Sequence, residues 1–156
     1  MQVTVITVGK IKEAHYKTAI EDYAKRILNY SSLKRIEIAD EKIIDSKLEE
    51  KIKEKEGEKI LKAISPNSFK IALSEYGKEF TSIDFSKFIT ELQNKGINEV
   101  SFIIGSAIGL SETVVKNSDF KLALAKMTLP HQMAQLFLLE QIYRAFKIMN
   151  NEPYHK

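Results

Sequence analysis

The segment VSFIIGSAIGL, residues 100–110, has the pattern of a buried strand that runs directly into a tight turn. Residues 100–104 are mainly apolar, with β-branched and aromatic side chains, which is typical of a strand covered on both faces. Gly105 and Gly109 follow, and glycine lets a backbone turn sharply and approach a ligand closely because it has no Cβ. The segment therefore predicts a strand of a parallel sheet with a turn at its carboxyl end.

Outward from this segment, strand-like and helix-like patterns alternate along the chain. The expected strands are 2–8, 34–38, 69–73, 100–104 and 120–124, with a loop over 74–78. The expected helices are 14–29, a charged and solvated segment within 41–62 that contains Gly57 as a weak point, 82–93, and a long helix from Pro130 to about Met149. This alternation favours an α/β fold with a mostly parallel sheet flanked by helices. Because no repeat or flexible linker divides the chain, we expect residues 1–156 to form a single domain.

Composition excludes several classes of protein. With 44% apolar and 29% charged residues, the chain has the balance of an ordinary globular protein. It has no cysteine and only three well-separated histidines, so we expect no disulfide and no metal site. No apolar run is long enough to span a membrane and no secretory signal is recognisable, so we expect a cytoplasmic protein without membrane contact. The net charge of +3 permits a nucleic-acid partner without demanding one.

The candidate ligand site follows from the predicted sheet. In open α/β sheets, ligands bind beyond the carboxyl ends of the strands, and three such ends stand out, at 73–75, 105–110 and 124–131. Neither a dinucleotide nor a phosphate-loop glycine pattern is present, and Gly105 and Gly109 are either plain turn residues or places of close ligand approach. The small and apolar segment 124–130 suits an adenine ring and a thioether chain. His131, in the first turn of the following helix, is either a capping or core residue or part of the site.

The C-terminal part of the chain has features of a subunit interface and of a nucleic-acid contact. Apolar residues cover more than one narrow stripe of the predicted helix 130–149, which favours a homodimer over simple packing in a core. Glu140 and Arg144 are four residues apart and predict an ion pair. The tail, residues 151–156, combines aromatic, imidazole and ammonium groups that can stack on a base and hold a phosphate. The alternative is a disordered end of the chain.

Several motifs together resemble one known family. They are Val8-Gly9-Lys10, Glu54-Lys55-Glu56-Gly57, Phe102-Ile103-Ile104-Gly105, Gly109-Leu110, Thr128-Leu129-Pro130-His131-Gln132-Met133, Glu140-Gln141-Ile142-Tyr143-Arg144-Ala145 and Pro153-Tyr154-His155-Lys156. In this order they resemble the ribosomal RNA large subunit methyltransferase H family, small members of the SPOUT class. The resemblance implies an α/β fold with a C-terminal trefoil knot and a homodimer that uses S-adenosyl-L-methionine. It also implies methylation of N3 of a pseudouridine in a hairpin of 23S rRNA, on the assembled ribosome.

The resemblance also assigns roles to individual residues. The expected contacts with S-adenosylmethionine are Leu73, Gly105, Leu124, Ala125, Lys126, Met127, Thr128 and Leu129. Tyr154 and His155, supplied by the same or the other subunit, are expected to shape the target-base site, and His131 to support the cofactor loop. The chain departs from the family pattern at Ser106, where a second glycine is usual, and at Gln135, where an arginine is common. The alternatives are a non-catalytic ribosome-associated factor that keeps the fold, or an α/β enzyme with a nicotinamide or flavin cofactor.

Overall fold

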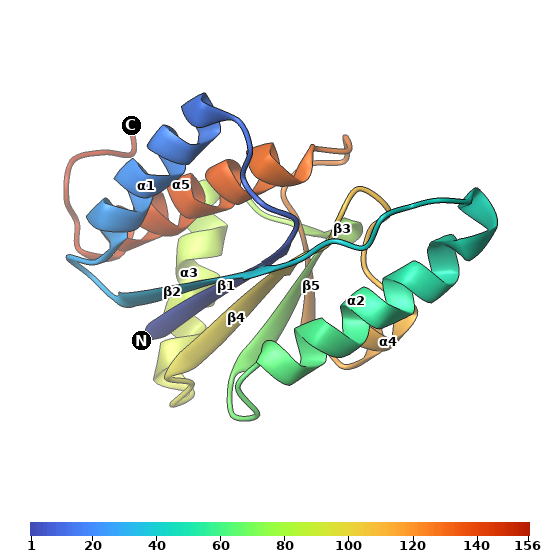
Figure 1. Cartoon of the computed structure of the whole chain (residues 1–156). Helices are drawn as coiled ribbons and strands as arrows, with labels where there is room; N and C mark the ends of the chain where they lie inside the picture. Colours follow the sequence, from blue (N-terminus) through green and yellow to red (C-terminus); the bar gives the residue numbers. More distant parts are fainter.

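The computed structural model describes residues 1–156 and contains one five-stranded sheet in which every neighbouring pair is parallel. The strand order is β2-β1-β4-β3-β5 (Figure 1). The elements are β1 (Gln2–Val8), α1 (Ala14–Ile27), β2 (Ser32–Ile38), the 3-10 turn η1 (Ser46–Leu48), α2 (Glu49–Ala63), β3 (Phe69–Glu79), α3 (Ser82–Asn94), β4 (Glu99–Ile104), α4 (Glu112–Lys116), β5 (Phe120–Ala123) and α5 (His131–Met149). The predicted α/β class with a parallel, helix-flanked sheet is confirmed.

Helices cover both faces of the sheet, which produces two hydrophobic cores. α1, α3 and α5 lie on one face, and α2 and α4 on the other (Figure 1). Alternate residues of the central strands point to opposite faces, so Val5 and Phe102 belong to the larger core while Ile6 and Ile103 belong to the smaller one. This two-sided burial explains why apolar residues of β1 and β4 do not simply alternate with polar ones.

The third strand differs from the prediction. β3 does not end at Leu73 but continues to Glu79, and its pairing with β5 shifts so that Leu73 and Lys78 both align with Leu122. The residues between them form an irregularity that brings Gly77 close to the β5 backbone, where an added Cβ would lie 2.6 Å from the Leu122 carbonyl carbon. The polar composition of this stretch resembles a loop, so local sequence does not reveal that it returns to the sheet.

The charged segment after β2 forms α2, but the helix is not merely solvated. Ile52, Glu56, Gly57 and Ile60 are buried in it. Gly57 is not a weak point, because a Cβ there would come within 2.4 Å of the Ser111 hydroxyl oxygen. The glycine thus permits α2 to pack closely against the start of α4, a short helix that the sequence pattern did not predict.

The last helix and the tail are held by the rest of the chain. α5 packs between α1 and α3 against the sheet, which accounts for most of its broad apolar surface within one molecule. Met133 and Phe137 remain 39% and 40% exposed, so some apolar surface is left for a partner. After α5 the tail folds back along α1 and α5 (Figure 1). No helix in the structure is both long and apolar enough to cross a membrane.

Candidate functional site

Three loops meet at the carboxyl edge of the sheet because β4, β3 and β5 are neighbours. They are the irregular end of β3 after Leu73, the turn 105–110 after β4, and the segment 124–130 between β5 and α5. All predicted cofactor residues lie in or beside these loops. The structure therefore brings them to one edge of the molecule, where open α/β sheets bind ligands.

The turn after β4 is compact, and its backbone geometry requires glycine at two positions. The Gly109 N–H donates to the Ser106 carbonyl oxygen at 2.9 Å, and Gly109 has a φ of +83°, which L residues rarely adopt. At Gly105 an added Cβ would lie 2.7 Å from the Gly109 carbonyl carbon, whereas at Gly109 nothing lies within 4 Å. Both glycines are thus required by backbone geometry, and the space over Gly109 is open.

Polar contacts join the other two loops. The Thr128 hydroxyl donates to a Glu75 carboxylate oxygen at 2.7 Å, and Lys126 lies 3.8 Å from the Glu79 carboxylate. Leu124 and Leu129 are half-buried against the larger core, while Met127 is 81% exposed. The segment therefore offers apolar side chains and main-chain groups, which suit the apolar parts of a ligand such as an adenine ring.

His131 and Gln132 connect the start of α5 to the end of β1. The His131 ring packs on Gly9, whose φ is +96°, and its Nε2 lies 3.4 Å from the Lys10 carbonyl oxygen. The Gln132 side-chain oxygen accepts from the backbone N–H groups of Lys12 and Glu13, at 2.9 and 3.1 Å. His131 thus contacts the chain just after β1, and the supporting role in the cofactor loop expected for it stays a prediction.

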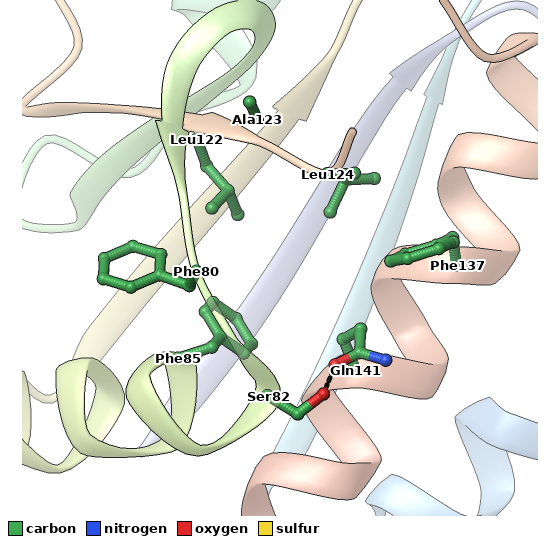
Figure 2. Close-up of a pocket in the computed structure, with 8 residues that line it drawn as sticks. All are labelled: Phe80, Ser82, Phe85, Leu122, Ala123, Leu124, Phe137 and Gln141. Carbon is green, nitrogen blue, oxygen red and sulfur yellow. Dashed lines mark hydrogen bonds between the residues drawn. The ribbon is translucent and has the colours of Figure 1, made fainter. Parts of the chain in front are cut away.

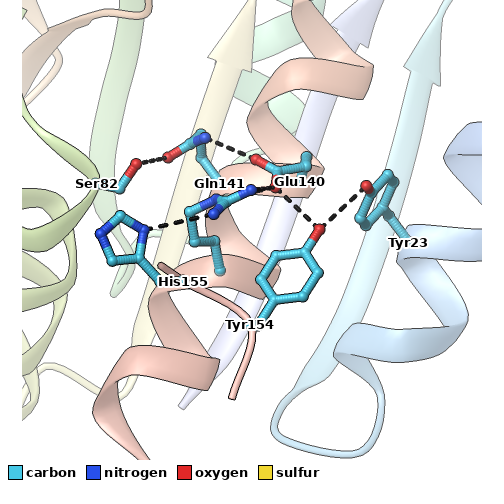
Figure 3. A network of polar contacts seen from close by, with 7 residues as sticks. Tyr23, Ser82, Glu140, Gln141, Tyr154 and His155 are labelled. Atoms are coloured by element: carbon cyan, nitrogen blue, oxygen red, sulfur yellow. Dashed lines mark hydrogen bonds and ion pairs between the residues drawn. The ribbon is translucent and has the colours of Figure 1, made fainter. Parts of the chain in front are cut away.

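The C-terminal tail forms a second polar group, on the outer side of α5 (Figure 3). The Tyr154 hydroxyl donates to a Glu140 carboxylate oxygen at 3.0 Å and lies 3.3 Å from the Tyr23 hydroxyl. Arg144 forms the predicted ion pair with Glu140 at 2.5 Å and donates to Nδ1 of His155 at 3.4 Å. The tail is docked, and the prediction of a Glu140–Arg144 pair is confirmed.

The surroundings of Tyr154 and Arg144 fix the protonation states of both side chains. Burial raises the pKa of the Tyr154 phenol, and the neighbouring Tyr23 and Glu140 raise it further. The hydrogen bond to Glu140 likewise raises the pKa of the Arg144 guanidinium. Tyr154 therefore remains a neutral hydrogen-bond donor at physiological pH, and Arg144 remains a cation.

A mainly apolar pocket lies between α5, α3 and the end of β5 (Figure 2). Its lining residues are mainly aromatic or aliphatic, namely Phe80, Ser82, Phe85, Leu122, Ala123, Leu124, Phe137 and Gln141. At its polar end the Ser82 hydroxyl donates to the Gln141 side-chain oxygen at 2.7 Å, and the Gln141 amide donates to Glu140 at 2.6 Å. The pocket thus touches Leu124 of the β5 loop on one side and the Glu140 network on the other.

Three contacts near these sites are not apparent from the sequence. The buried Glu56 accepts a hydrogen bond from Ser106, Gln141 links the pocket to Glu140, and Tyr23 reaches the tail from α1. Glu56 lies within the motif Glu54-Lys55-Glu56-Gly57, but its burial is visible only in three dimensions. The Tyr23 contact spans most of the chain, so no local pattern indicates it.

Comparison with known proteins gives consistent matches over the full length. A family model described as "Predicted SPOUT methyltransferase" matches residues 1–155. "Ribosomal RNA large subunit methyltransferase H" of Clostridium tetani is 52% identical to this chain, covering all of both chains. "Putative ribosomal RNA large subunit methyltransferase H" of Methanococcus maripaludis is 50% identical with the same coverage. A probable methylase family protein from Haemophilus influenzae superposes with a TM-score of 0.56 at 14% identity, over 99% of this chain and 70% of that one, so this likeness concerns the fold.

Proposed function

The chain belongs to the SPOUT methyltransferase family, and from that premise we propose that it methylates N3 of a pseudouridine in the 23S rRNA of the large ribosomal subunit, using S-adenosyl-L-methionine. The observation that carries this proposal is the 52% identity, over all of both chains, to a relative named as a large-subunit rRNA methyltransferase. We further propose that the protein works in the cytoplasm on assembled ribosomes.

The cofactor is assigned to the loops at the carboxyl edge of the sheet. Leu73, Gly105 and the segment 124–129 (Leu124, Ala125, Lys126, Met127, Thr128 and Leu129) hold it in this proposal. Their chemistry fits, because the half-buried leucines offer an apolar wall and the open space over Gly109 leaves room for close approach to the backbone. When bound, S-adenosylmethionine supplies an activated methyl group, so the protein has chiefly to orient the acceptor.

The target base is assigned to the tail network of Tyr154 and His155. N3 carries a proton, so a base must remove it or a positive group must stabilise the resulting anion. Arg144 can only donate hydrogen bonds, so Nδ1 of His155 is the acceptor in their contact and, in the neutral ring, the proton lies on Nε2. This arrangement favours stabilisation of the anion by Arg144 and the His155 N–H, with the neutral Tyr154 hydroxyl as a further donor.

Within one chain, the tail and the cofactor loops lie at different positions along α5. Tyr154 contacts Glu140, whereas the loops lead into His131. At the helical rise of 1.5 Å per residue, roughly 13 Å separate the two levels. We propose that a homodimer brings the tail of one subunit to the loops of the other, over the exposed Met133 and Phe137. Sedimentation of the purified protein as a dimer is the expected result, and a monomer at working concentration argues against this part of the proposal.

Transfer of labelled methyl from S-adenosylmethionine to ribosomes that lack the modification tests the proposed function. Label in 23S rRNA that maps to a pseudouridine is the expected result. Naked rRNA should be a much poorer substrate, because the small, mildly basic chain must read the folded ribosome by shape. Binding to ribosomes without methyl transfer would instead indicate a non-catalytic ribosome-associated factor, and no label together with no binding would refute the proposal.

A further inference from the structure

Glu56 is a buried carboxylate with no part in the function proposed above. It lies on α2, on the face of the sheet opposite α5, and is only 2% exposed. Burying a charged or polar group is costly unless it is well hydrogen-bonded. One of its oxygens accepts from the Ser106 hydroxyl at 2.8 Å, and the other accepts from the Glu41 backbone N–H at 3.2 Å. Glu56 therefore connects the turn after β4 to the segment after β2.

Ser106 is the one residue of the turn 105–110 with a polar side chain. The Ser106 hydroxyl thus makes the only side-chain hydrogen bond from this turn to another element, and it donates that bond to Glu56. The rest of the turn is held by its own backbone, through the contact between Gly105 and Gly109. Removal of the carboxylate would leave the turn attached to the sheet but free to shift relative to α2.

Neighbouring positions of α2 contact the chain just after the turn. Gly57 leaves room for Ser111, whose hydroxyl caps α4. Glu54 accepts a hydrogen bond from the Thr113 hydroxyl at 3.0 Å. α2 thus contacts both the turn and the start of α4, and Glu56 is its contact with the turn.

We propose that Glu56 is a positioning residue for cofactor binding, which acts through the Ser106 hydroxyl to hold the turn 105–110 in its ligand-binding shape. This inference rests on the function proposed above, because it assigns the turn to the cofactor. Glu56 itself touches no cofactor and takes part in no bond-making step. Its effect is on the affinity for S-adenosylmethionine and for the product S-adenosylhomocysteine.

The conservative variant Glu56→Gln provides a sharp test of the mechanism. A glutamine oxygen can still accept from the Glu41 N–H, and its amide can donate to the Ser106 hydroxyl, since a hydroxyl both donates and accepts. Glu56→Gln should therefore bind S-adenosylhomocysteine within about 3-fold of wild type, whereas Glu56→Ala should bind it about 10-fold more weakly. Glu58→Ala is the matched control, because Glu58 lies on the same helix, is exposed and has no hydrogen-bond partner; its affinity should be unchanged.

A double-mutant cycle separates positioning from a general loss of stability. Ser106→Ala removes the same hydrogen bond from the other side at a half-buried position, so it serves even where Glu56→Ala does not fold. Ser106→Ala should weaken binding of S-adenosylhomocysteine to a similar degree, and Glu56→Ala combined with Ser106→Ala should bind no more weakly than Glu56→Ala alone.

The measurement is isothermal titration of S-adenosylhomocysteine into each folded variant, with circular dichroism as the check on folding. Absence of binding by the wild-type chain would refute the proposed cofactor, and with it the function. Wild-type binding together with unchanged affinity in Ser106→Ala, or with additive losses in the double variant, would overturn the role of Glu56 alone. Rescue by glutamine and non-additive losses would support it.

Discussion

Replacement of Gly105 by alanine should damage the turn after β4 more than its position in a loop suggests. The added Cβ would lie 2.7 Å from the Gly109 carbonyl carbon, 2.8 Å from its oxygen and 2.9 Å from the Leu110 nitrogen. These are backbone atoms that cannot rotate away, so the turn itself must move. Overpacking of this kind costs about 1–3 kcal/mol of unfolding free energy, and the displaced turn should bind S-adenosylhomocysteine at least about 10-fold more weakly.

Gly96→Ala is the control for Gly105→Ala. Gly96 has a φ of +78° with nothing within 4 Å of an added Cβ, and it lies between α3 and β4, at the opposite edge of the sheet. Its replacement should cost about 1–2 kcal/mol through backbone strain alone and leave cofactor affinity unchanged. Urea unfolding and isothermal titration measure the two quantities. If Gly105→Ala binds S-adenosylhomocysteine as tightly as Gly96→Ala, the turn does not have the assigned role.

Three further predictions concern α5 and the tail. Tyr154→Phe removes the hydroxyl that donates to Glu140 but keeps the ring. Turnover on ribosomes should fall at least about 10-fold, and the affinity for S-adenosylhomocysteine should be unchanged. Turnover equal to that of the wild type would show that the hydroxyl is dispensable. Gln135 is 1% exposed, and its side-chain oxygen has no hydrogen-bond partner. Gln135→Met should therefore raise the free energy of unfolding, measured in urea, by about 1 kcal/mol. A lower free energy of unfolding in the variant would contradict this reasoning and indicate a polar contact at Gln135. The hydrogen bond from Lys147 lowers the pKa of Glu152, so this contact is complete above the ordinary glutamate pKa and is lost as the pH falls through the lowered value. The tail should therefore become more mobile below about pH 4.5, which NMR relaxation can measure. The variant Glu152→Gln should remove this pH dependence.

The sequence could predict β1 and β4 because both strands are buried on both faces. Val5 and Ile6 enter different cores, so a mainly apolar, β-branched run correctly indicated a strand of a parallel sheet. The short helix α4 was missed because five residues carry too little periodicity, although Ser111 caps it in the usual manner. The extension of β3 was missed because its pairing with β5 depends on a close approach at Gly77 that no local pattern encodes.

The site could be predicted in part for a similar reason. The loops follow from the rule that ligands bind at the carboxyl ends of parallel strands, which requires only the strand positions. The buried carboxylate of Glu56 could not be recognised, because in sequence it is one of many alternating charges of a helix that is otherwise largely solvated. The docking of Tyr154 onto Tyr23 joins the two ends of the chain, and contacts of that range depend on the finished fold.

The interior position of β1 in the sheet has a consequence for synthesis of the protein. β1 emerges from the ribosome before β4, yet Gln2 pairs with Glu99 of β4, and α5, which completes the larger core, is made after both strands. At 5–20 residues per second, roughly 5–20 s pass between translation of these two strands. During that interval an apolar strand has no neighbour on its β4 side, so the sheet must be completed after most of the chain has been released, and pairing over this distance is intrinsically slow. Nascent chains should therefore depend on chaperones more than a small domain of this size ordinarily does.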